Sequence, residues 1–172
     1  MKTKFLYIFF IIVVTGCAST YKHSELQSLS SKLDPSKGVL ISVPEDGWYE
    51  NTQYRNSGKS AANAIRVAFI KNASKVDVVS SCHGDECLET IDSVKYGYYV
   101  KPDILHWEDR ATEWSGKSDR IEIQIVVYDT VSKIELANTT YTGKSKWATF
   151  GGDHPQDLLS EPTDQYINSL YQ

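Results

Sequence analysis

Residues 120–130 read RIEIQIVVYDT, and in this stretch apolar side chains alternate with polar ones. A period of two residues is typical of a β-strand that buries one of its faces. The buried face is expected to carry Ile121, Ile123, Ile125 and Val127. The next residues, VSK (131–133), predict a tight turn, and IELANTTYTGKSKW (134–147) predicts the antiparallel partner strand. A hairpin with one buried face is therefore the centre of the fold.

Strand-like and helix-like segments alternate around this hairpin. Short runs rich in β-branched and aromatic residues predict strands over 38–44, 75–81 and 97–108, the last interrupted or entered by Pro102. Helical spacing of apolar residues predicts helices over 60–73 and from Ser160 to the C-terminus, with a short helix or turn over 89–96. The order predicts an α+β fold (a mixed α/β sandwich), with helices packed on one side of a mostly antiparallel sheet.

The N-terminus reads MKTKFLYIFFIIVVTGCAST (1–20), in which two lysines precede about ten apolar residues, as in a secretory signal. The apolar run is too short for a permanent membrane-spanning helix, which needs roughly 20 residues. The motif VTGC (14–17) resembles the lipobox of bacterial lipoproteins. The resemblance implies that the signal peptide, 1–16, is removed and that Cys17 carries three acyl chains, palmitate among them. An ordinary signal peptide with a chance cysteine is the alternative.

Ala18 follows the lipobox cysteine. In Gram-negative lipoproteins an aspartate at this position resembles an inner-membrane retention signal. Alanine therefore implies an outer-membrane lipoprotein that faces the periplasm. The polar stretch 17–37 is expected to be a tether, either disordered or with a short helix near 24–33, and the globular domain is expected over 38–172.

The charge of the mature chain bears on its partners. Without Lys2 and Lys4, 16 Lys and Arg remain of 18, against 22 Asp and Glu, which gives a net charge of about −6. Nucleic acid and anionic lipid both favour clustered Lys and Arg, so neither is expected as the main partner. The membrane is expected as a partner through the lipid anchor, and another envelope protein is expected as the partner of the domain.

Cys82 and Cys87 flank a short loop, SCHGDEC (81–87). In an oxidising periplasm such a pair is expected to form a disulfide bond. The spacing differs from the Cys-x-x-Cys of thioredoxin-like enzymes. A metal site is the alternative, with ligands among Cys82, His83, Asp85, Glu86 and Cys87. A second ligand cluster at finger-like spacing is absent from the sequence, so we expect no metal and no cofactor.

The motifs of common hydrolases are missing: there is no G-x-S-x-G, and TGKS (142–145) lacks the glycine-rich span of a phosphate loop. An envelope hydrolase remains an alternative hypothesis. It would use His106 or His154 with a nearby carboxylate. The candidate carboxylates are Glu108, Asp109 and Asp153.

The stretch ILHWEDRATEWSG (104–116) contains histidine, tryptophan and several charges. In a regular strand, Ile104, His106 and Glu108 would share one face and Trp107 the other, which separates Glu108 from Asp109. We therefore expect structure or recognition here, and no catalysis. Tryptophan and arginine are favoured at interface hot spots. The candidate binding residues are Trp107, Glu108, Arg110 and Trp114.

The string LHWEDRATEWSG (105–116), together with HPQDLL (154–159) and the lipobox, resembles an uncharacterised family of Gram-negative lipoproteins that is catalogued as a domain of unknown function. The resemblance implies an outer-membrane lipoprotein and no particular activity. The order of elements is also similar to small periplasmic lipoprotein domains that activate peptidoglycan synthases, assist transport complexes or assemble secretion pores. We therefore expect a non-enzymatic binding or accessory domain in the cell envelope.

Overall fold

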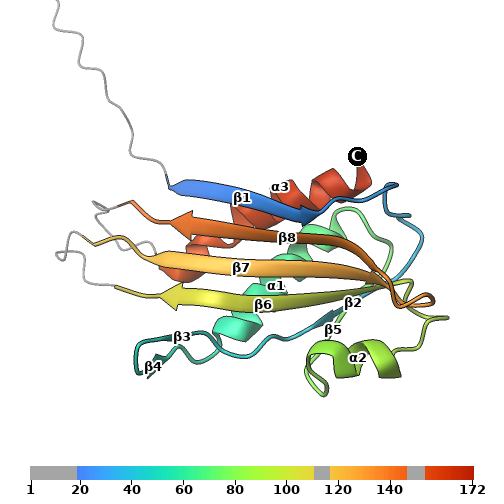
Figure 1. Cartoon of the computed structure of the whole chain (residues 1–172), viewed down its shortest axis with the longest axis horizontal. Helices are drawn as coiled ribbons and strands as arrows, with labels where there is room; N and C mark the ends of the chain where they lie inside the picture. The colour runs from blue at the N-terminus through green and yellow to red at the C-terminus, as the bar shows by residue number, and fades with distance from the viewer. Residues whose placement is uncertain (1–18, 111–116, 147–153) are drawn as a thin grey trace, which may run out of the picture.

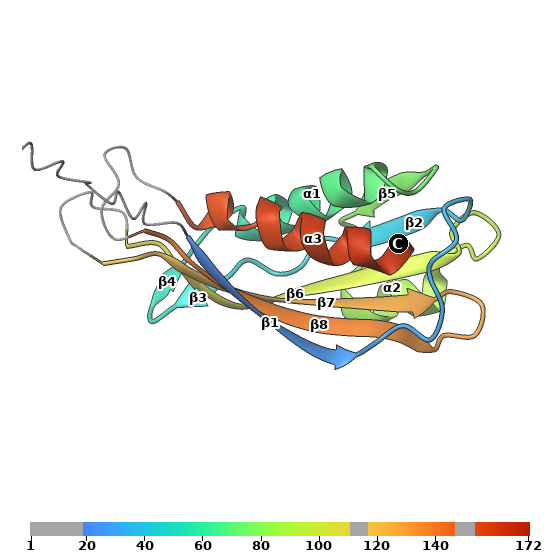
Figure 2. The same ribbon diagram turned by 90° about the horizontal axis from the view of Figure 1, so that it is seen from above.

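A computed structural model describes residues 19–110, 117–146 and 154–172. One six-stranded sheet dominates the fold, with strand order β1-β8-β7-β6-β2-β5. Figure 1 shows the four long strands side by side, and Figure 2 shows two long helices lying along one face of the sheet. The predicted α+β class is confirmed.

Four of the strands form an antiparallel half. β6 (Tyr98–Glu108) pairs with β7 (Arg120–Asp129), which pairs with β8 (Glu135–Lys144), and β1 (Thr20–Gln27) completes this edge. The strand predicted from the alternation of apolar and polar residues over 121–127 is therefore confirmed. Ile121, Ile123, Ile125 and Val127 are all buried beneath the helices.

The other half of the sheet is parallel. β2 (Val39–Ser42) lies between β6 and β5 (Val76–Val79) and runs parallel to both. The helix α1 (Ser57–Ile70) connects β2 to β5, as a parallel pair requires. β2 reaches only to Val100 of β6. Pro102 is therefore tolerated within β6, because β7 is the only neighbour in the sheet at that point.

The helices lie on both faces of the sheet. α1 and α3 (Ser160–Tyr171) pack against each other and cover one face (Figure 2). The short helix α2 (Gly84–Thr90) packs Cys87 and Leu88 against Tyr99, in a second small core that is separate from the main one. The remaining elements are the hairpin β3 (Trp48–Tyr49) and β4 (Thr52–Gln53), and a 3-10 turn, η1 (Pro155–Leu158).

The N-terminal segment differs from its prediction. Thr20–Gln27 forms β1 and pairs with β8, and Leu33 is buried in the main core. The expectation of a tether over 17–37 is therefore wrong from Thr20 on, and no helix forms near 24–33. The strand escaped detection because nearly all of its side chains are exposed, so they carry no apolar alternation.

Two helices are shifted along the chain. α1 begins at Ser57, three residues before the predicted start, because Asn56 has the left-handed backbone conformation (φ 69°) that ends the preceding turn. The helix near the cysteine pair begins at Gly84, so it includes Cys87 and ends at Thr90. The rest of the predicted range of 89–96 contains a turn, in which the backbone N–H groups of Lys95 and Tyr96 donate to the carbonyl of Asp92, so the turn alternative is confirmed there. The predicted C-terminal helix is confirmed, with Tyr166, Ile167 and Leu170 buried.

Candidate functional site

A bulge near the end of β6 decides which residues share a face. Ile104 pairs with Ile123 and His106 pairs with Glu122, so Leu105 has no partner. The extra residue reverses the alternation. Trp107 therefore shares the buried face with Ile104, while His106 lies on the opposite face. The prediction that Ile104 and His106 share a face is wrong.

Glu108 is the centre of a polar cluster at this end of β6. Its side chain is almost fully buried, yet it contacts three polar side chains. The Arg110 guanidinium donates its Nε–H to Oε1, and His106 Nε2 lies 3.5 Å from Oε2. Arg110 also donates to the Tyr49 hydroxyl at 3.3 Å, and the Tyr49 ring meets the His106 ring edge-on at 5.4 Å between centroids.

The electrostatics of the cluster favour the ionised form of Glu108. Burial of the carboxylate opposes ionisation, but hydrogen bonds from Arg110, Tyr49 and His106 outweigh burial and lower the pKa of Glu108 below its ordinary value. The hydrogen bond to Glu108 raises the pKa of Tyr49 and, in the same way, that of Arg110. A carboxylate with a lowered pKa and several bound donors is a poor proton acceptor near neutral pH.

The other predicted acid–base pair is looser. His154 Nδ1 lies 3.9 Å from Oδ2 of Asp109, and His154 stands at the start of η1. Asp109 follows Glu108 at the end of β6, so the two histidines lie near the same end of the sheet but contact different carboxylates. Asp153 lies outside the described residues.

The predicted contact surface is only partly formed by exposed groups. Trp107 is 3% exposed and Glu108 is 1% exposed, so neither contributes to an exposed binding surface, which corrects that part of the prediction. Arg110 is partly exposed, with 30% of its side chain accessible. Trp114 lies outside the described residues.

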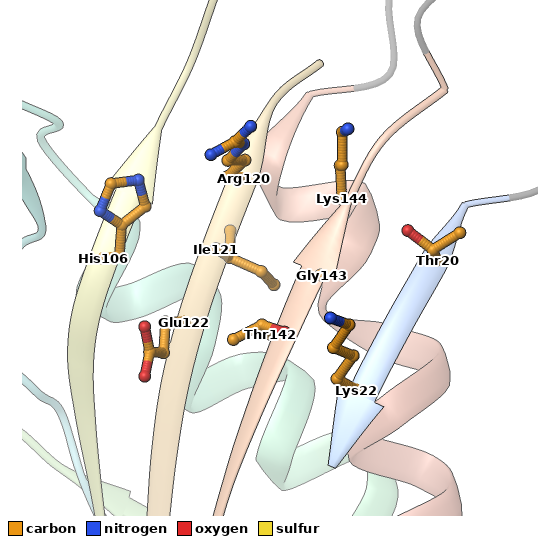
Figure 3. Close-up of a pocket in the computed structure, with 9 residues that line it drawn as sticks. All are labelled: Thr20, Lys22, His106, Arg120, Ile121, Glu122, Thr142, Gly143 and Lys144. Carbon is orange, nitrogen blue, oxygen red and sulfur yellow. The ribbon is translucent and has the colours of Figure 1, made fainter. Parts of the chain in front are cut away.

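A hollow of about 390 Å³ opens beside this cluster, on the sheet face opposite α1 and α3 (Figure 3). Strand register builds it from two rows of side chains. One row, across β1, β8 and β7, is Thr20, Lys144 and Arg120. The other row, across β1, β8, β7 and β6, is Lys22, Thr142, Glu122 and His106.

The hollow has an excess of positive charge. Lys22, Arg120 and Lys144 are exposed, and among the described residues none of them has a carboxylate oxygen within 4.0 Å. Among the described residues that line it, Glu122 is the single carboxylate. Three cations without a close counter-ion, next to the hydroxyls of Thr20 and Thr142, suit a ligand that carries phosphate or carboxylate oxygens.

The cysteine loop forms a structural clasp. Cys82 and Cys87 are joined by a disulfide bond with their α-carbons 5.2 Å apart. Neither sulfur is then available as a thiolate ligand, which contradicts the alternative of a metal site here. Within the part of the chain that the structure describes, no group of three or more His, Cys, Asp or Glu is placed to hold a metal ion.

The sequence did not reveal several residues of these sites. Tyr49 stood in a segment without periodicity, and Lys22 in the supposed tether. Thr142 and Lys144 belong to the TGKS stretch, which lacks the pattern of a phosphate loop. Lys22, Thr142 and Lys144 come together only through strand register, because paired residues on neighbouring strands point to the same face. Tyr49 reaches the cluster through the packing of β3 against β6.

The fold and the hollow define a single-sheet α+β domain with two long helices on one face and a polar opposite face. The chain belongs to the family DUF4823, a domain of unknown function, which matches residues 31–170. The family predicted from the sequence is thus confirmed as a domain of unknown function, while the lipobox lies outside the described residues. No curated protein sequence matches the chain significantly.

Several solved structures are similar to this fold. The PelC dodecamer from Paraburkholderia phytofirmans has a TM-score of 0.66 at 12% identity, covering 88% of this chain and 96% of that one. Protein XCC0632 from Xanthomonas campestris, of the DUF330 family, has a TM-score of 0.51 at 12% identity, covering 84% and 87%. Lipoprotein GNA1162 from Neisseria meningitidis reaches 0.44 at 9% identity, covering 78% and 97%. At these identities the likeness shows the fold alone.

Proposed function

We propose that the chain is an outer-membrane lipoprotein, anchored through Cys17, whose periplasmic domain binds another component of the cell envelope without catalysing a reaction. The observation that carries the proposal is the polar face of the sheet opposite α1 and α3. In the described chain the short helix α2 packs on that face at the end near Tyr99, and Tyr49 of β3 contacts His106 near the other end.

The face is built for hydrogen bonding. Gln124 and Asn138, on neighbouring strands, are joined by a hydrogen bond of 2.9 Å that fixes both amides. Thr140 stands between them and the hollow, half-buried, and Ser24 on β1 is exposed. A face of ordered amides and hydroxyls favours a polar partner, since each group finds a hydrogen-bond acceptor or donor without rearrangement.

The anchor accounts for the position of the domain. Among the described residues no helix is long and apolar enough to cross a membrane. The acyl chains expected on Cys17 supply the attachment instead. A single acyl chain binds a membrane only reversibly, whereas several chains on one residue anchor it stably. β1 begins at Thr20, so the sheet stands directly beside the anchor.

Fractionation tests the anchor and its address. Wild-type chain is expected in the outer-membrane fraction with palmitate label, and Cys17→Ser is expected to lose the label. Ala18→Asp is expected to keep the label and move to the inner-membrane fraction. Palmitate label that persists in Cys17→Ser would disprove lipidation at this residue. If Ala18→Asp stayed in the outer-membrane fraction, residue 18 would not determine the membrane to which the chain is sorted.

Photo-crosslinking in intact cells tests the binding face. A crosslinking amino acid at Thr140, on the polar face, is compared with one at Arg66, which is exposed on α1. We expect one discrete product from position 140 and none from position 66. A product at a multiple of the chain's own mass identifies the partner as a second copy, in line with the PelC dodecamer. Equal products at both positions, or none at position 140, would contradict the proposal.

Hydrolysis is the second candidate, and one observation favours it: His106 lies 3.5 Å from Glu108, as an acid–base pair requires. The lowered pKa of Glu108 suits a role that orients His106 rather than one that accepts a proton. A hydroxyl nucleophile beside His106 would complete a hydrolase, and among the described residues none hydrogen-bonds its ring. The binding function is therefore preferred.

A further inference from the structure

The hollow lies at the end of the sheet where β1, the first strand of the chain, begins. Thr20 is the first residue of β1 and lines the hollow itself. Lys144 is the last residue of β8 and Arg120 the first of β7, so both cations stand at that strand end. Figure 3 shows the side chains of Arg120 and Lys144 near the top of the view, with Lys22 below them on β1.

The distance to the anchor follows from covalent geometry. Cys17 precedes Thr20 by three residues. Three residues span at most roughly 10 Å when fully extended. A lipid attached at Cys17 therefore lies within roughly 10 Å of Thr20, at the edge of the hollow. This distance is comparable to the Debye length of roughly 8 Å at physiological salt.

We propose that Lys22, Arg120 and Lys144 form a docking surface for the phosphates of anionic phospholipid headgroups, which orients the domain on the membrane that anchors it. The proposal rests on the lipid anchor of the proposed function. Charge complementarity supports the choice of occupant, because among the described residues the three cations have no carboxylate oxygen within 4.0 Å and outnumber Glu122 in the hollow, while the anchor brings headgroup phosphates close to them.

The acidity of the whole chain agrees with this orientation. A mature net charge of about −6 repels an anionic leaflet. Salt screens this repulsion for charged groups that lie further from the leaflet than about one Debye length. The local cluster of Lys22, Arg120 and Lys144 therefore decides which end of the domain faces the membrane. The opposite end of the sheet, where β5 and β6 begin, then points away from the membrane.

Amine labelling of the acylated chain tests the proposal. The chain is purified from membranes, reconstituted into vesicles of phosphatidylcholine alone or mixed with phosphatidylglycerol, and treated with an amine-reactive reagent. Mass spectrometry then reports the labelling rate of each lysine. We expect Lys22 and Lys144 to react roughly fivefold more slowly on the mixed vesicles, since each lysine close to an anionic surface is stabilised there. High salt should restore the rate.

Lys75 and Lys95 are internal controls in the same molecule. Both are exposed and lie at the opposite strand ends, just before β5 and β6. Their labelling rates are expected to be equal on the two kinds of vesicle. Protection of all four lysines would show a non-specific charge effect and would overturn the docking surface, as would unchanged rates at Lys22 and Lys144.

A variant tests the role of the third cation. Arg120→Glu is expected to restore the labelling of Lys22 and Lys144 on mixed vesicles, whereas Arg120→Lys should retain the protection. Persistent protection in Arg120→Glu would overturn the proposal. The same spectra report the N-terminal peptide: an unacylated Cys17 contradicts the proposed function, whereas an acylated chain without protection contradicts only the docking surface.

Discussion

Ile104 and Trp107, three residues apart on β6, lie on the same face of the sheet. In a regular strand this spacing would place them on opposite faces. The bulge at Leu105 brings both into the main core and leaves Leu105 itself 52% exposed. The same bulge turns His106 to the open face and so creates the polar cluster around Glu108.

Gly47 packs against both of these side chains, and an added methyl group has no room there. A β-carbon at position 47 would lie 2.6 Å from Cβ of Trp107 and 2.9 Å from Cγ2 of Ile104. Gly47→Ala is expected to lower the free energy of unfolding by about 1–3 kcal/mol, the usual cost of overpacking. Chemical denaturation followed by circular dichroism measures this loss.

Gly97→Ala is the matched control. A β-carbon at position 97 would meet the side chain of Lys37, with its Cδ at 2.6 Å, its Cβ at 2.9 Å and its Cγ at 3.0 Å. The exposed lysine chain can turn away more easily than the side chains of Trp107 and Ile104, so this substitution is expected to cost less than Gly47→Ala. Equal losses for Gly47→Ala and Gly97→Ala would show that Trp107 and Ile104 do not confine position 47.

Glu108→Gln is expected to destabilise the domain by about 2 kcal/mol, because the amide removes the charge that holds Arg110 and Tyr49 and brings a donor into a site full of donors. Denaturation at neutral pH measures the loss. Glu122→Gln is the control on the neighbouring strand, since Glu122 is half-buried and lines the hollow. It should change stability by less than about 0.5 kcal/mol.

The pH dependence of stability has a defined sign. The pKa of Glu108 is lower in the folded chain than its ordinary value of 4.5, so the unfolded state binds the proton more tightly. The stabilisation is therefore complete above pH 4.5 and is lost as the pH falls from there through the lower folded pKa. Glu108→Gln should lack this part of the acid dependence. An identical acid profile for wild type and variant would contradict the assigned pKa shift.

The strongly patterned parts of the fold could be predicted from the sequence. The isoleucines of 121–125 and the apolar residues of the last helix lie as their spacing indicates, because both elements bury one face and expose the other. β1 could not be predicted in this way. It is an edge strand with nearly every side chain exposed, and backbone pairing with β8 holds it in place.

The candidate site was less predictable than the fold. A bulge leaves no mark in the pattern of apolar residues, so the faces of 104–108 were assigned in the wrong register. The cationic rows combine Lys22 on β1, which is far from the other strands in sequence, with Arg120 and Lys144 at the open end of the hairpin of β7 and β8. Only the pairing of β1 with β8 and of β8 with β7 brings these residues together.

Removal of the disulfide is expected to destabilise the domain modestly. A ring closed by Cys82 and Cys87 contains few residues, so its loss should cost about 2 kcal/mol of loop entropy. The Cys82→Ser/Cys87→Ser variant measured by thermal unfolding tests this, with reductant-treated wild type as the second comparison. If the midpoint of thermal unfolding fell in the variant but not in reduced wild type, the serine side chains, rather than the broken disulfide, would cause the loss of stability.

The bond should also control the small core beneath α2. The Tyr99 hydroxyl donates to the carbonyl of Gly84 at 2.7 Å and lies 2.8 Å from Ser42 Oγ, which can donate to it. Burial raises the pKa of Tyr99 to about 12. Without the disulfide, hydrogen exchange is expected to accelerate in 84–90 while β7 and β8 stay protected. Uniform acceleration across the sheet would contradict a local role for the bond.

Tyr141 and Thr163 form a hydrogen bond between β8 and α3 inside the main core, with 2.8 Å between their hydroxyl oxygens. Both side chains are almost fully buried. Thr163→Val leaves the Tyr141 hydroxyl buried without this partner, which is expected to cost about 1–3 kcal/mol in the free energy of unfolding. Tyr141→Phe should cost a similar amount by leaving the Thr163 hydroxyl unsatisfied.

The double variant Tyr141→Phe/Thr163→Val removes both polar groups at once, so neither hydroxyl is left without its partner. It is expected to be at least as stable as either single variant, with a coupling energy of about 1–2 kcal/mol between the two positions. Chemical denaturation of the four chains provides the complete cycle. Simple additivity would show that the hydroxyl pair does not hold α3 to β8, and that apolar contacts such as those of Ile167 and Leu170 anchor the helix alone.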